Sequence, residues 1–366
     1  MAAMPEDPSQ MPTAHRVALL ARDDRPFHII LAQQFDRELI HTLSRLAEQV
    51  RAVAETRQGA NFLRTLLSHK RAMLYFTQPS TRTFLSFSAA CQIIGLAYNE
   101  VRDPSTSSEV KGESEEDTVR VLSQYFDVII MRHPREGFAE AMAHQLNQMR
   151  RGIPLINGGS GKDQHPTQAL LDIYTLHRCF SRVGADGVIH AFEENPFAGK
   201  TIAFVGDLLR GRTVRSLVYL LCRYPGVRLL FVAPPQLQIK EDILEYVRRY
   251  NVEYEISENL PEVISRCDAV YMTRLQDEHD VAGESKALDY DRFRLDVDMA
   301  VRFKPHLAIL HPLPRRNELD VRLDADPRAK YWEQVRNGMW IRAALLAYVF
   351  RVDAAIIDHY QSHYSY

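Results

Sequence analysis

The sequence predicts an α/β protein with two doubly wound parallel-sheet domains and a crevice between them. Its 366 residues exceed what one hydrophobic core usually organises, so two domains are expected. Short apolar runs alternate with segments of helical period along most of the chain. This alternation is typical of parallel sheets covered by helices on both faces, where functional residues gather beyond the carboxyl ends of the strands.

The first domain is predicted at residues 27–165, after an N-terminal tail of residues 1–26. The tail is rich in proline, glutamine and charge, and its lack of periodicity predicts a loosely ordered segment. Apolar residues at positions 84, 87, 91 and 94 recur at helical spacing and predict a helix that ends near Gly95. Strands are predicted at residues 72–76, 128–131 and 154–157.

The second domain is predicted at residues 166–337, and a C-terminal helix, 338–366, is expected to complete the first domain. Pro166 supplies a preset φ for the first position of a long helix, whose buried face holds apolar residues at 169, 170, 173 and 176. The pattern lapses at residues 181–196, which indicates a surface loop or an insertion. Strands are predicted at 201–205, 228–233, 269–272 and 307–310, and helices at 214–221, 241–249 and 339–350.

Composition and charge exclude several classes of protein. The net charge of -2 argues against nucleic acid as the main partner. No apolar run approaches the roughly 20 residues that span a bilayer, and the N-terminus has no signal-peptide pattern. We therefore expect a cytoplasmic protein without a membrane segment. The four scattered cysteines predict small buried thiols rather than disulfides or a zinc site, and no metal or cofactor is expected.

The first candidate site is the segment 80–83, Ser-Thr-Arg-Thr, between a predicted strand and the helix that follows it. The unpaired N–H groups of a helix start attract anions, and three hydroxyls and a guanidinium supply further donors for a phosphate. A helix cap with a solvated arginine is the alternative. Arg132 directly follows another strand, and Lys111 lies in the polar loop 105–113; a surface ion pair and an ordinary surface loop are their alternatives.

The second candidate is His165 with Gln168, where Pro166 opens a helix. The positive end of a helix dipole disfavours imidazolium, so His165 is expected to be neutral. A neutral imidazole can donate one hydrogen bond to a carbonyl oxygen without giving up its proton. A plain capping role is the alternative for this histidine.

Three more clusters follow predicted strands of the second domain. One contains Arg212 and lacks the G-x-G-x-x-G spacing of a dinucleotide fold. The next contains Arg274 and Gln276, and the last contains Leu313 and Pro314, whose carbonyls an extended proline-rich backbone can present to a ligand. An ordinary loop with solvated charges is the alternative for each. Together the clusters offer many cations, few acids and no Ser-His-Asp or metal-ligand arrangement, which suits a pair of anionic substrates.

From residue 27 to residue 352 the chain resembles the aspartate/ornithine carbamoyltransferase family. Segment 80–83, Arg132-His133-Pro134 and the motif His165-Pro166-Thr167-Gln168 are similar to the carbamoyl phosphate signatures of that family. Segments 206–213 and 273–276 are similar to the two aspartate-binding segments of its aspartate branch. Leu313 stands where ornithine enzymes typically carry cysteine, and no ornithine-type S-M-G motif occurs. The resemblance therefore favours aspartate as the acceptor.

The resemblance implies carbamoyl transfer from carbamoyl phosphate to the α-amino group of L-aspartate, giving N-carbamoyl-L-aspartate and phosphate in de novo pyrimidine synthesis. Arg212 would bind the α-carboxylate of aspartate, and Arg274 with Gln276 the β-carboxylate. The implied catalytic residues are Arg82, Thr83, Arg132 and His165. The residues implied to bind carbamoyl phosphate are Ser80, Thr81, Arg82, Thr83, Ser107, Lys111, Arg132, His165, Gln168, Leu313 and Pro314; those implied to bind aspartate are Lys111, Arg212, Arg274 and Gln276.

The family also implies a homotrimer in which the loop 105–113 enters the neighbouring subunit's site. Regulatory or dihydroorotase activity would come from a separate chain. The sequence departs from the family at Phe84 and at residues 277–279, two places where a second arginine is common. A carbamoyltransferase for another amine is the runner-up, although Arg274 would repel a cationic side chain. A non-catalytic homologue is a third reading, which predicts loss of cationic anchors that this sequence keeps.

Overall fold

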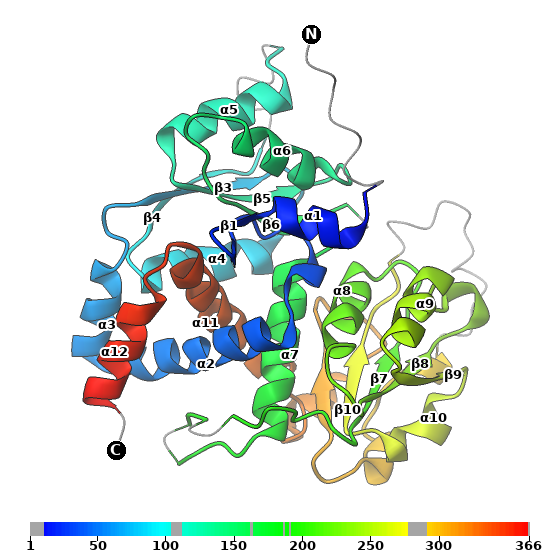
Figure 1. The fold of residues 1–366 in the computed structure, drawn as a ribbon. Coiled ribbons are helices and arrows are strands. Elements are labelled where there is room, and N and C mark those ends of the chain that lie inside the picture. Colours follow the sequence, from blue (N-terminus) through cyan, green and yellow to red (C-terminus); the bar gives the residue numbers. More distant parts are fainter. Residues whose placement is uncertain are drawn as a thin grey trace. The chain divides into compact units, whose positions relative to one another are not determined.

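The computed structural model describes residues 11–103, 112–161, 164–185, 187–189, 192–276 and 291–364. The chain divides into two compact units, Met1–Thr167 with Gly338–Tyr366, and Gln168–Asn337. Each unit is built on one parallel sheet with helices around it (Figure 1). The predicted fold class of two parallel-sheet α/β domains is confirmed, and the crevice expected between them stays a prediction. Within the described ranges, no helix is both long and apolar enough to cross a membrane.

The sheet of the first unit has the strand order β4-β3-β5-β6, and neighbouring strands are parallel. The two central strands, β3 and β5, are buried along almost their whole length, which explains their apolar sequences. β4 is half-exposed at one edge and carries polar residues, and it was not predicted. The strands are β3 (Arg71–Phe76), β4 (Ala97–Val101), β5 (Val128–His133) and β6 (Leu155–Ser160).

Helices cover both faces of this sheet. On one face, α5 (Glu115–Tyr125) and α6 (Phe138–Asn147) contribute Val119 and Met142 to a core cluster with Met73 and Ile129. On the other face, α4 (Thr81–Ile93) places the Phe84 ring edge-on to Phe76, with 5.6 Å between the ring centroids. This arrangement fixes the N-terminus of α4 at the carboxyl end of β3.

The interpretation of residues 1–26 as a loosely ordered tail is wrong for residues 13–26. Helix α1 (Thr13–Leu19) is followed by a small antiparallel pair, β1 (Ala21–Arg22) and β2 (Arg25–Pro26). Arg16 holds α1 against α6 through two hydrogen bonds to Glu140, at 2.9 and 2.6 Å. α1 buries none of its residues, so no apolar periodicity marked it in the sequence.

The first unit is completed by helices from both ends of the chain. α2 (Arg37–Ala54) begins at Asp36, whose side chain accepts a hydrogen bond from Leu39 N–H, and α3 (Arg57–Thr65) follows it. The single C-terminal helix expected at residues 338–366 is in fact two helices, because the backbone turns at Arg351, where φ is 60°. These are α11 (Tyr331–Val349), which begins before the expected residue 339, and α12 (Asp353–His363).

The sheet of the second unit has the order β11-β10-β7-β8-β9, and its neighbouring strands are also parallel. The bounds of β7, β10 and α9 agree with the predicted ones. The strands are β7 (Thr201–Val205), β8 (Arg228–Val232), β9 (Glu253–Ser257), β10 (Ala269–Met272) and β11 (Ala308–Leu310). The helices are α7 (Pro166–Phe180), α8 (Arg212–Leu221), α9 (Glu241–Arg249) and α10 (Leu260–Val263).

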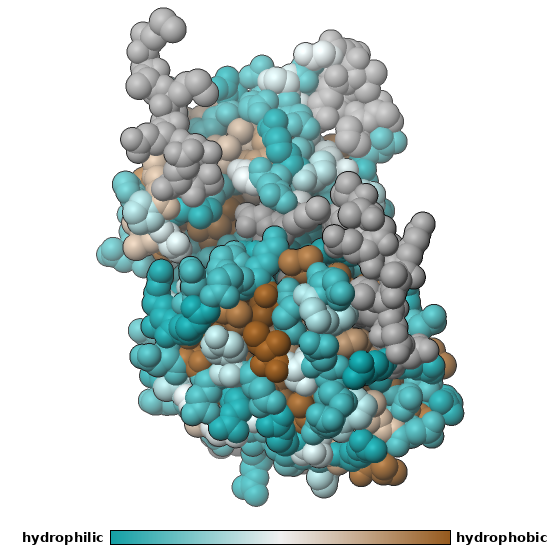
Figure 2. Space-filling model, turned by 90° about the vertical axis from the view of Figure 1, so that its right-hand side faces the viewer, coloured by the Kyte–Doolittle hydropathy of each residue, from teal (hydrophilic) through white to brown (hydrophobic). Residues whose placement is uncertain are grey.

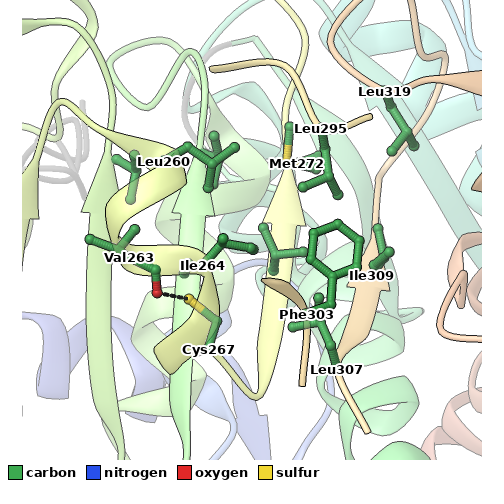
Figure 3. Packing of buried hydrophobic residues seen from close by; sticks show 14 of the residues in the cluster. Leu260, Val263, Ile264, Cys267, Met272, Leu295, Phe303, Leu307, Ile309 and Leu319 are labelled. Carbon is green, nitrogen blue, oxygen red and sulfur yellow. Dashed lines mark hydrogen bonds between the residues drawn. The ribbon is translucent and has the colours of Figure 1, made fainter. Parts of the chain in front are cut away.

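Both faces of this second sheet are covered as well. Figure 3 shows Leu260, Val263 and Ile264 from α10 and the turn after it, beside Met272 and Ile309 of the sheet. On the opposite face, α7 contacts β10 through a hydrogen bond from Tyr271 to Asp172. Hydrophilic residues cover most of the molecular face in Figure 2, as the charged fraction of 25% leads one to expect.

Residues 181–196 contain no helix or strand among the positions that the structure describes. The surface-loop interpretation is wrong for Val188 and Ile189, which are buried, and the alternative of an insertion stays a prediction. Arg178 at the end of α7 donates a hydrogen bond of 2.9 Å to the carbonyl of Gly187, which ties the stretch to the helix. The segment is therefore partly packed against its own unit.

The four cysteines are free thiols. Cys91, Cys222 and Cys267 are buried as predicted, and Cys179 is half-buried. Burial raises the pKa of each of the four thiols to about 12, so they stay protonated at neutral pH.

His28 is a buried histidine whose protonation destabilises the folded state. Its Nδ1 accepts a hydrogen bond from Leu155 N–H at 3.0 Å, so the proton lies on Nε2, which is 3.1 Å from Asn147 Oδ1. Burial lowers the pKa of His28 from 6.5 to about 4. Between these two values the unfolded chain binds a proton that the folded chain does not bind. The free energy of unfolding should therefore fall as pH drops from 6.5 towards 4, by about 3 kcal/mol in all.

Urea unfolding of the wild type and of His28→Gln between pH 4.5 and 7.5 measures this effect. The variant lacks the titrating group, so the difference in unfolding free energy between the two proteins should shrink as pH falls below 6.5. Carboxylates that titrate in both proteins cancel in this difference. Parallel pH profiles for the two proteins would contradict the assigned role of His28.

Candidate active site

The segment 80–83 lies where the sequence places it, at the start of α4 and beyond the carboxyl end of β3. Ser80 is the N-cap residue, with extended backbone angles, but its side chain makes no capping hydrogen bond. The Ser80 side chain therefore does not cap the helix. Arg82 is exposed and Thr83 is buried, so the hydroxyl and the guanidinium face different surroundings. The N–H groups of this helix start and these side chains are the donors of the predicted phosphate site, which stays a prediction.

Arg132 lies on β5, directly beside the end of β3, because it pairs in register with Phe76. Its side chain is buried, and Nη1 donates a hydrogen bond of 3.2 Å to the carbonyl of Gly158. The register between β5 and β6 shifts at this point, so that β6 has one extra residue between its pairings with Met131 and His133. Such a bulge next to a polar side chain is common beside functional sites.

Gly158 and Gly159 form this bulge, and their lack of side chains lets three polar residues meet there. A Cβ on Gly159 would lie 2.6 Å from Arg132 Nη1 and 3.3 Å from His165 Cδ2. The φ of Gly159 is 113°, which also favours glycine. Thr83 Oγ1 lies 3.3 Å from His165 Nε2. Residues from α4, β5 and the start of α7 are thus brought together, as the sequence predicted for each alone.

Asn157 was missed as a site residue, although it organises the bulge. Its Oδ1 accepts a hydrogen bond from Gly159 N–H at 2.8 Å, and its Nδ2 donates to Ile30 O at 3.1 Å. The sequence signal was available, since Asn157 is the last residue of a predicted strand and Gly158 and Gly159 directly follow it. A pair of glycines at a strand end indicates close approach of other groups to the backbone.

His133 follows Arg132 in sequence but serves a different part of the unit. Its Nε2 lies 2.9 Å from Glu115 Oε1 at the start of α5, and its Nδ1 accepts from Arg135 N–H at 3.2 Å. Successive side chains of a strand point to opposite faces, which explains the division. The motif therefore contributes Arg132 to the candidate site and His133 to the anchoring of α5.

The predictions for the loop 105–113 and for residues 277–279 cannot be compared with the structure, whereas the prediction for Phe84 can. Ser107, Lys111 and residues 277–279 lie outside the described residues. Phe84, at the position where the family usually has an arginine, is buried. The guanidinium of Arg102 lies 4.5 Å from the centroid of the Phe84 ring. Position 84 therefore joins α4 to the sheet through ring contacts.

In the second unit, Asp207 ties together two of the predicted segments. It is fully buried, and its Oδ1 accepts from Arg210 N–H at 3.1 Å. Its Oδ2 accepts from Gln276 N–H, also at 3.1 Å. Thr273 adds a second link, because its Oγ1 donates to Val205 O at 2.9 Å. The loops after β7 and β10 thus lie side by side at the carboxyl edge of the sheet.

These two loops place their arginines at that edge. Arg212 is the first residue of α8, and Arg274 follows the end of β10; both are half-buried. Arg274 Nη1 donates a hydrogen bond of 2.8 Å to Leu275 O, which holds its side chain along the loop. Two guanidiniums on adjacent loops are suited to a ligand with two carboxylates, because each can form two parallel hydrogen bonds.

The loop after β11 is held by a buried histidine. His311 Nδ1 accepts from Leu313 N–H at 2.7 Å, so its Nε2 carries the proton and donates to Glu318 Oε1 at 2.8 Å. Burial alone would raise the pKa of Glu318, but the hydrogen bonds from His311 and Arg316 N–H outweigh it and lower that pKa. The Leu313–Pro314 peptide bond is cis, and the φ of Leu313 is 55°.

Comparisons with known proteins identify the family of this chain. Residues 28–178 match the family model "Aspartate/ornithine carbamoyltransferase, carbamoyl-P binding domain", and residues 198–349 match "Aspartate/ornithine carbamoyltransferase, Asp/Orn binding domain". The chain is 41% identical over 325 residues to "Aspartate carbamoyltransferase 1, chloroplastic" of Pisum sativum, an alignment that covers 87% of this chain and 77% of that protein. The chain belongs to the aspartate/ornithine carbamoyltransferase family.

Further relatives within the family are named for the same activity. The "Aspartate carbamoyltransferase catalytic subunit" of Methanosarcina mazei is 38% identical over 320 residues, which cover 87% of this chain and 96% of that protein. The crystal structure of aspartate transcarbamoylase from Trypanosoma cruzi in complex with carbamoyl phosphate and aspartate is 35% identical. It aligns over 88% of this chain and 95% of that one, with a TM-score of 0.75.

Proposed function

We propose that this chain transfers the carbamoyl group of carbamoyl phosphate to the α-amino group of L-aspartate, as a step of pyrimidine synthesis. The products are N-carbamoyl-L-aspartate and phosphate. The observation that carries the proposal is the meeting of Thr83, Arg132 and His165 around Gly158 and Gly159, at the edge where α4 begins. Membership of the family supplies the reaction, and the similar Trypanosoma cruzi enzyme is described with both substrates bound.

Carbamoyl phosphate is assigned to the first unit, residues 27–165 with 338–366. Its phosphate accepts hydrogen bonds from Ser80, Thr81, Arg82 and Thr83 at the start of α4. Its carbonyl oxygen accepts from Thr83, Arg132 and His165, where negative charge develops as the carbon becomes tetrahedral. Arg132 suits this task because its side chain is buried and already oriented by Gly158 O, so little reorganisation accompanies the reaction.

Aspartate is assigned to the second unit, residues 166–337. Arg212 binds the α-carboxylate, and Arg274 with Gln276 binds the β-carboxylate. The α-amino nitrogen attacks the carbamoyl carbon, the bond from that carbon to the phosphate oxygen breaks, and the departing phosphate takes a proton from the amine. No covalent intermediate with the protein is needed. Alignment of the two substrates then supplies much of the rate enhancement.

One assay tests the reaction and its acceptor. Purified full-length protein is incubated with carbamoyl phosphate and either L-aspartate or L-ornithine at millimolar concentrations, and the carbamoylated products are quantified. We expect carbamoyl aspartate and no citrulline. Citrulline in place of carbamoyl aspartate would support the runner-up, a carbamoyltransferase for another amine. No product with either acceptor would support a non-catalytic homologue.

We also propose a homotrimer with shared sites, on the basis of the resemblance of the loop 105–113. Ser107 and Lys111 would then act in the neighbouring subunit's site. Mixing inactive Lys111→Ala and His165→Ala subunits should restore activity, because a mixed trimer contains some sites with neither substitution. The activity of the refolded mixture is compared with that of each variant refolded alone. No gain on mixing would contradict shared sites.

The compartment is proposed to be the cytoplasm. The support is the four free thiols, which suit a reducing compartment. The relative from Pisum sativum is named chloroplastic, so an organelle is the competing location. A fluorescent fusion of the full-length protein, imaged in its own cells, separates the two. Signal confined to an organelle would contradict the cytoplasmic assignment.

A further inference from the structure

Asp172 is a buried carboxylate on α7, one turn after Gln168, and it accepts hydrogen bonds from Gln168, Gln334 and Tyr271. Its Oδ1 accepts from Gln168 Nε2 at 2.9 Å and from Gln334 Nε2 at 2.6 Å. Its Oδ2 accepts from Tyr271 OH at 2.8 Å. Burial, and after it the charge of Asp172, raise the pKa of Tyr271 well above its ordinary value, so the phenol keeps its proton and remains a donor. Neither Asp172 nor Gln334 was among the predicted site residues.

The directions of these hydrogen bonds follow from the chemistry of the partners. The backbone N–H of His311 must donate, and its acceptor is Gln334 Oε1 at 2.9 Å. The Gln334 amide is therefore oriented with its NH₂ towards Asp172. A carboxylate with this many donors around it is an acceptor on both oxygens. Gln168 must then also present its NH₂ to Asp172, which leaves its Oε1 directed away from the carboxylate.

We propose that Asp172 is a positioning residue that makes Gln168 an acceptor for the NH₂ group of carbamoyl phosphate. This inference rests on the proposed function and on the family resemblance, which implies that Gln168, Leu313 and Pro314 bind carbamoyl phosphate; their oxygens would orient its NH₂. Gln168 is half-buried, so its Oε1 has access to a ligand. Without Asp172, the Gln168 amide could rotate by about 180°. Its NH₂ group would then face the NH₂ group of the substrate, and two hydrogen-bond donors do not attract each other.

Asp172 also connects the two sets of acceptors. Through Gln334 it reaches His311 N–H, and the imidazole of His311 holds Leu313 N–H at 2.7 Å. Hydrogen bonds through Asp172, Gln334 and His311 therefore connect the side chain of Gln168 to the backbone of the Leu313–Pro314 loop. The same network would place both groups of acceptors around a single NH₂ donor.

Acetyl phosphate is the probe that isolates this effect, because it replaces the NH₂ of carbamoyl phosphate with a methyl group. We measure the dissociation constants of carbamoyl phosphate and acetyl phosphate by titration calorimetry on the full-length protein. The wild type should favour carbamoyl phosphate. In Asp172→Ala the ratio of the two constants should drop about tenfold, with binding of acetyl phosphate little changed. General damage to the fold weakens both ligands alike and leaves the ratio unchanged.

A second variant and a matched control separate positioning from structural support. Asp172→Asn keeps the volume of the side chain but offers one acceptor oxygen to three donors, so the ratio should drop less than in the alanine variant. Tyr271→Phe removes the hydrogen bond from Tyr271 to Asp172 and the contact of the phenol with Gln168, and it leaves the hydrogen bond from Gln168 to Asp172 in place. Its ratio should stay within twofold of the wild type, although its stability should fall.

The outcomes distinguish this inference from the proposed function. A wild type that does not bind carbamoyl phosphate would contradict the proposed function itself. A wild type that discriminates, with an unchanged ratio in Asp172→Ala or an equal drop in Tyr271→Phe, would overturn the role of Asp172 alone. A drop confined to the two Asp172 variants supports it.

Discussion

Replacing Arg132 by alanine is expected to lower kcat by about 10²- to 10³-fold, with the protein still folded. The guanidinium is the buried cation beside Thr83 and His165, and its Nη1 is fixed by Gly158 O at 3.2 Å. It would donate to the carbonyl oxygen of carbamoyl phosphate where charge increases in the transition state. Loss of such a preorganised donor raises the barrier for the chemical step more than it weakens substrate binding.

Steady-state kinetics of Arg132→Ala and a matched control measure this effect. Arg120→Ala removes an exposed arginine of the same unit, on α5, whose ion pair with Asp117 spans 3.2 Å. Exposed pairs of this kind contribute little to stability, so kcat should stay within twofold of the wild type. Arg132→Lys should fall between the two, because it keeps the charge and loses the planar fork. A kcat near the wild-type value in Arg132→Ala would remove Arg132 from the mechanism.

The parts of the fold that the sequence predicted are those buried on both faces. β3, β5, β7 and β10 have continuous apolar sequences because helices cover them above and below. The edge strands β4 and β9 were missed, since none of their residues is buried and polar residues such as Asn99 and Glu255 interrupt any apolar run. Helix α1 was missed for a similar reason. An ion pair between Arg16 and Glu140, rather than an apolar face, attaches it to α6.

The candidate site was predictable residue by residue but not as a network. Arg132, His165 and Arg274 each follow a strand or begin a helix, and such positions can be read from the local pattern. The contact between Asp172 and Gln334 joins residues 162 positions apart, and neither follows a strand. Only the folded chain brings such pairs together. The same applies to the bulge at Gly158, which depends on the register of β6 against β5.

Replacing Arg274 by alanine is expected to raise the KM for aspartate by about 100-fold, through the loss of a charged and bidentate contact to the β-carboxylate. The side chain lies on the loop after β10, held by Leu275 O at 2.8 Å, and Gln276 N–H ties that loop to Asp207. The phosphate contacts are assigned to other residues. The dissociation constant of carbamoyl phosphate, measured by calorimetry, should therefore change less than twofold.

Arg266→Ala is the matched control for this variant, because Arg266 lies before β10, at the opposite end of the strand from Arg274. Its guanidinium is exposed and pairs with Glu255 through hydrogen bonds of 2.9 and 2.7 Å. Aspartate saturation should be unchanged in this control, whereas any general weakening of β10 would appear in both variants. Arg274→Lys should recover part of the affinity, since it restores the charge without the fork. If Arg274→Ala and Arg266→Ala saturate with aspartate alike, Arg274 does not bind the β-carboxylate, and another cation must set the preference for aspartate.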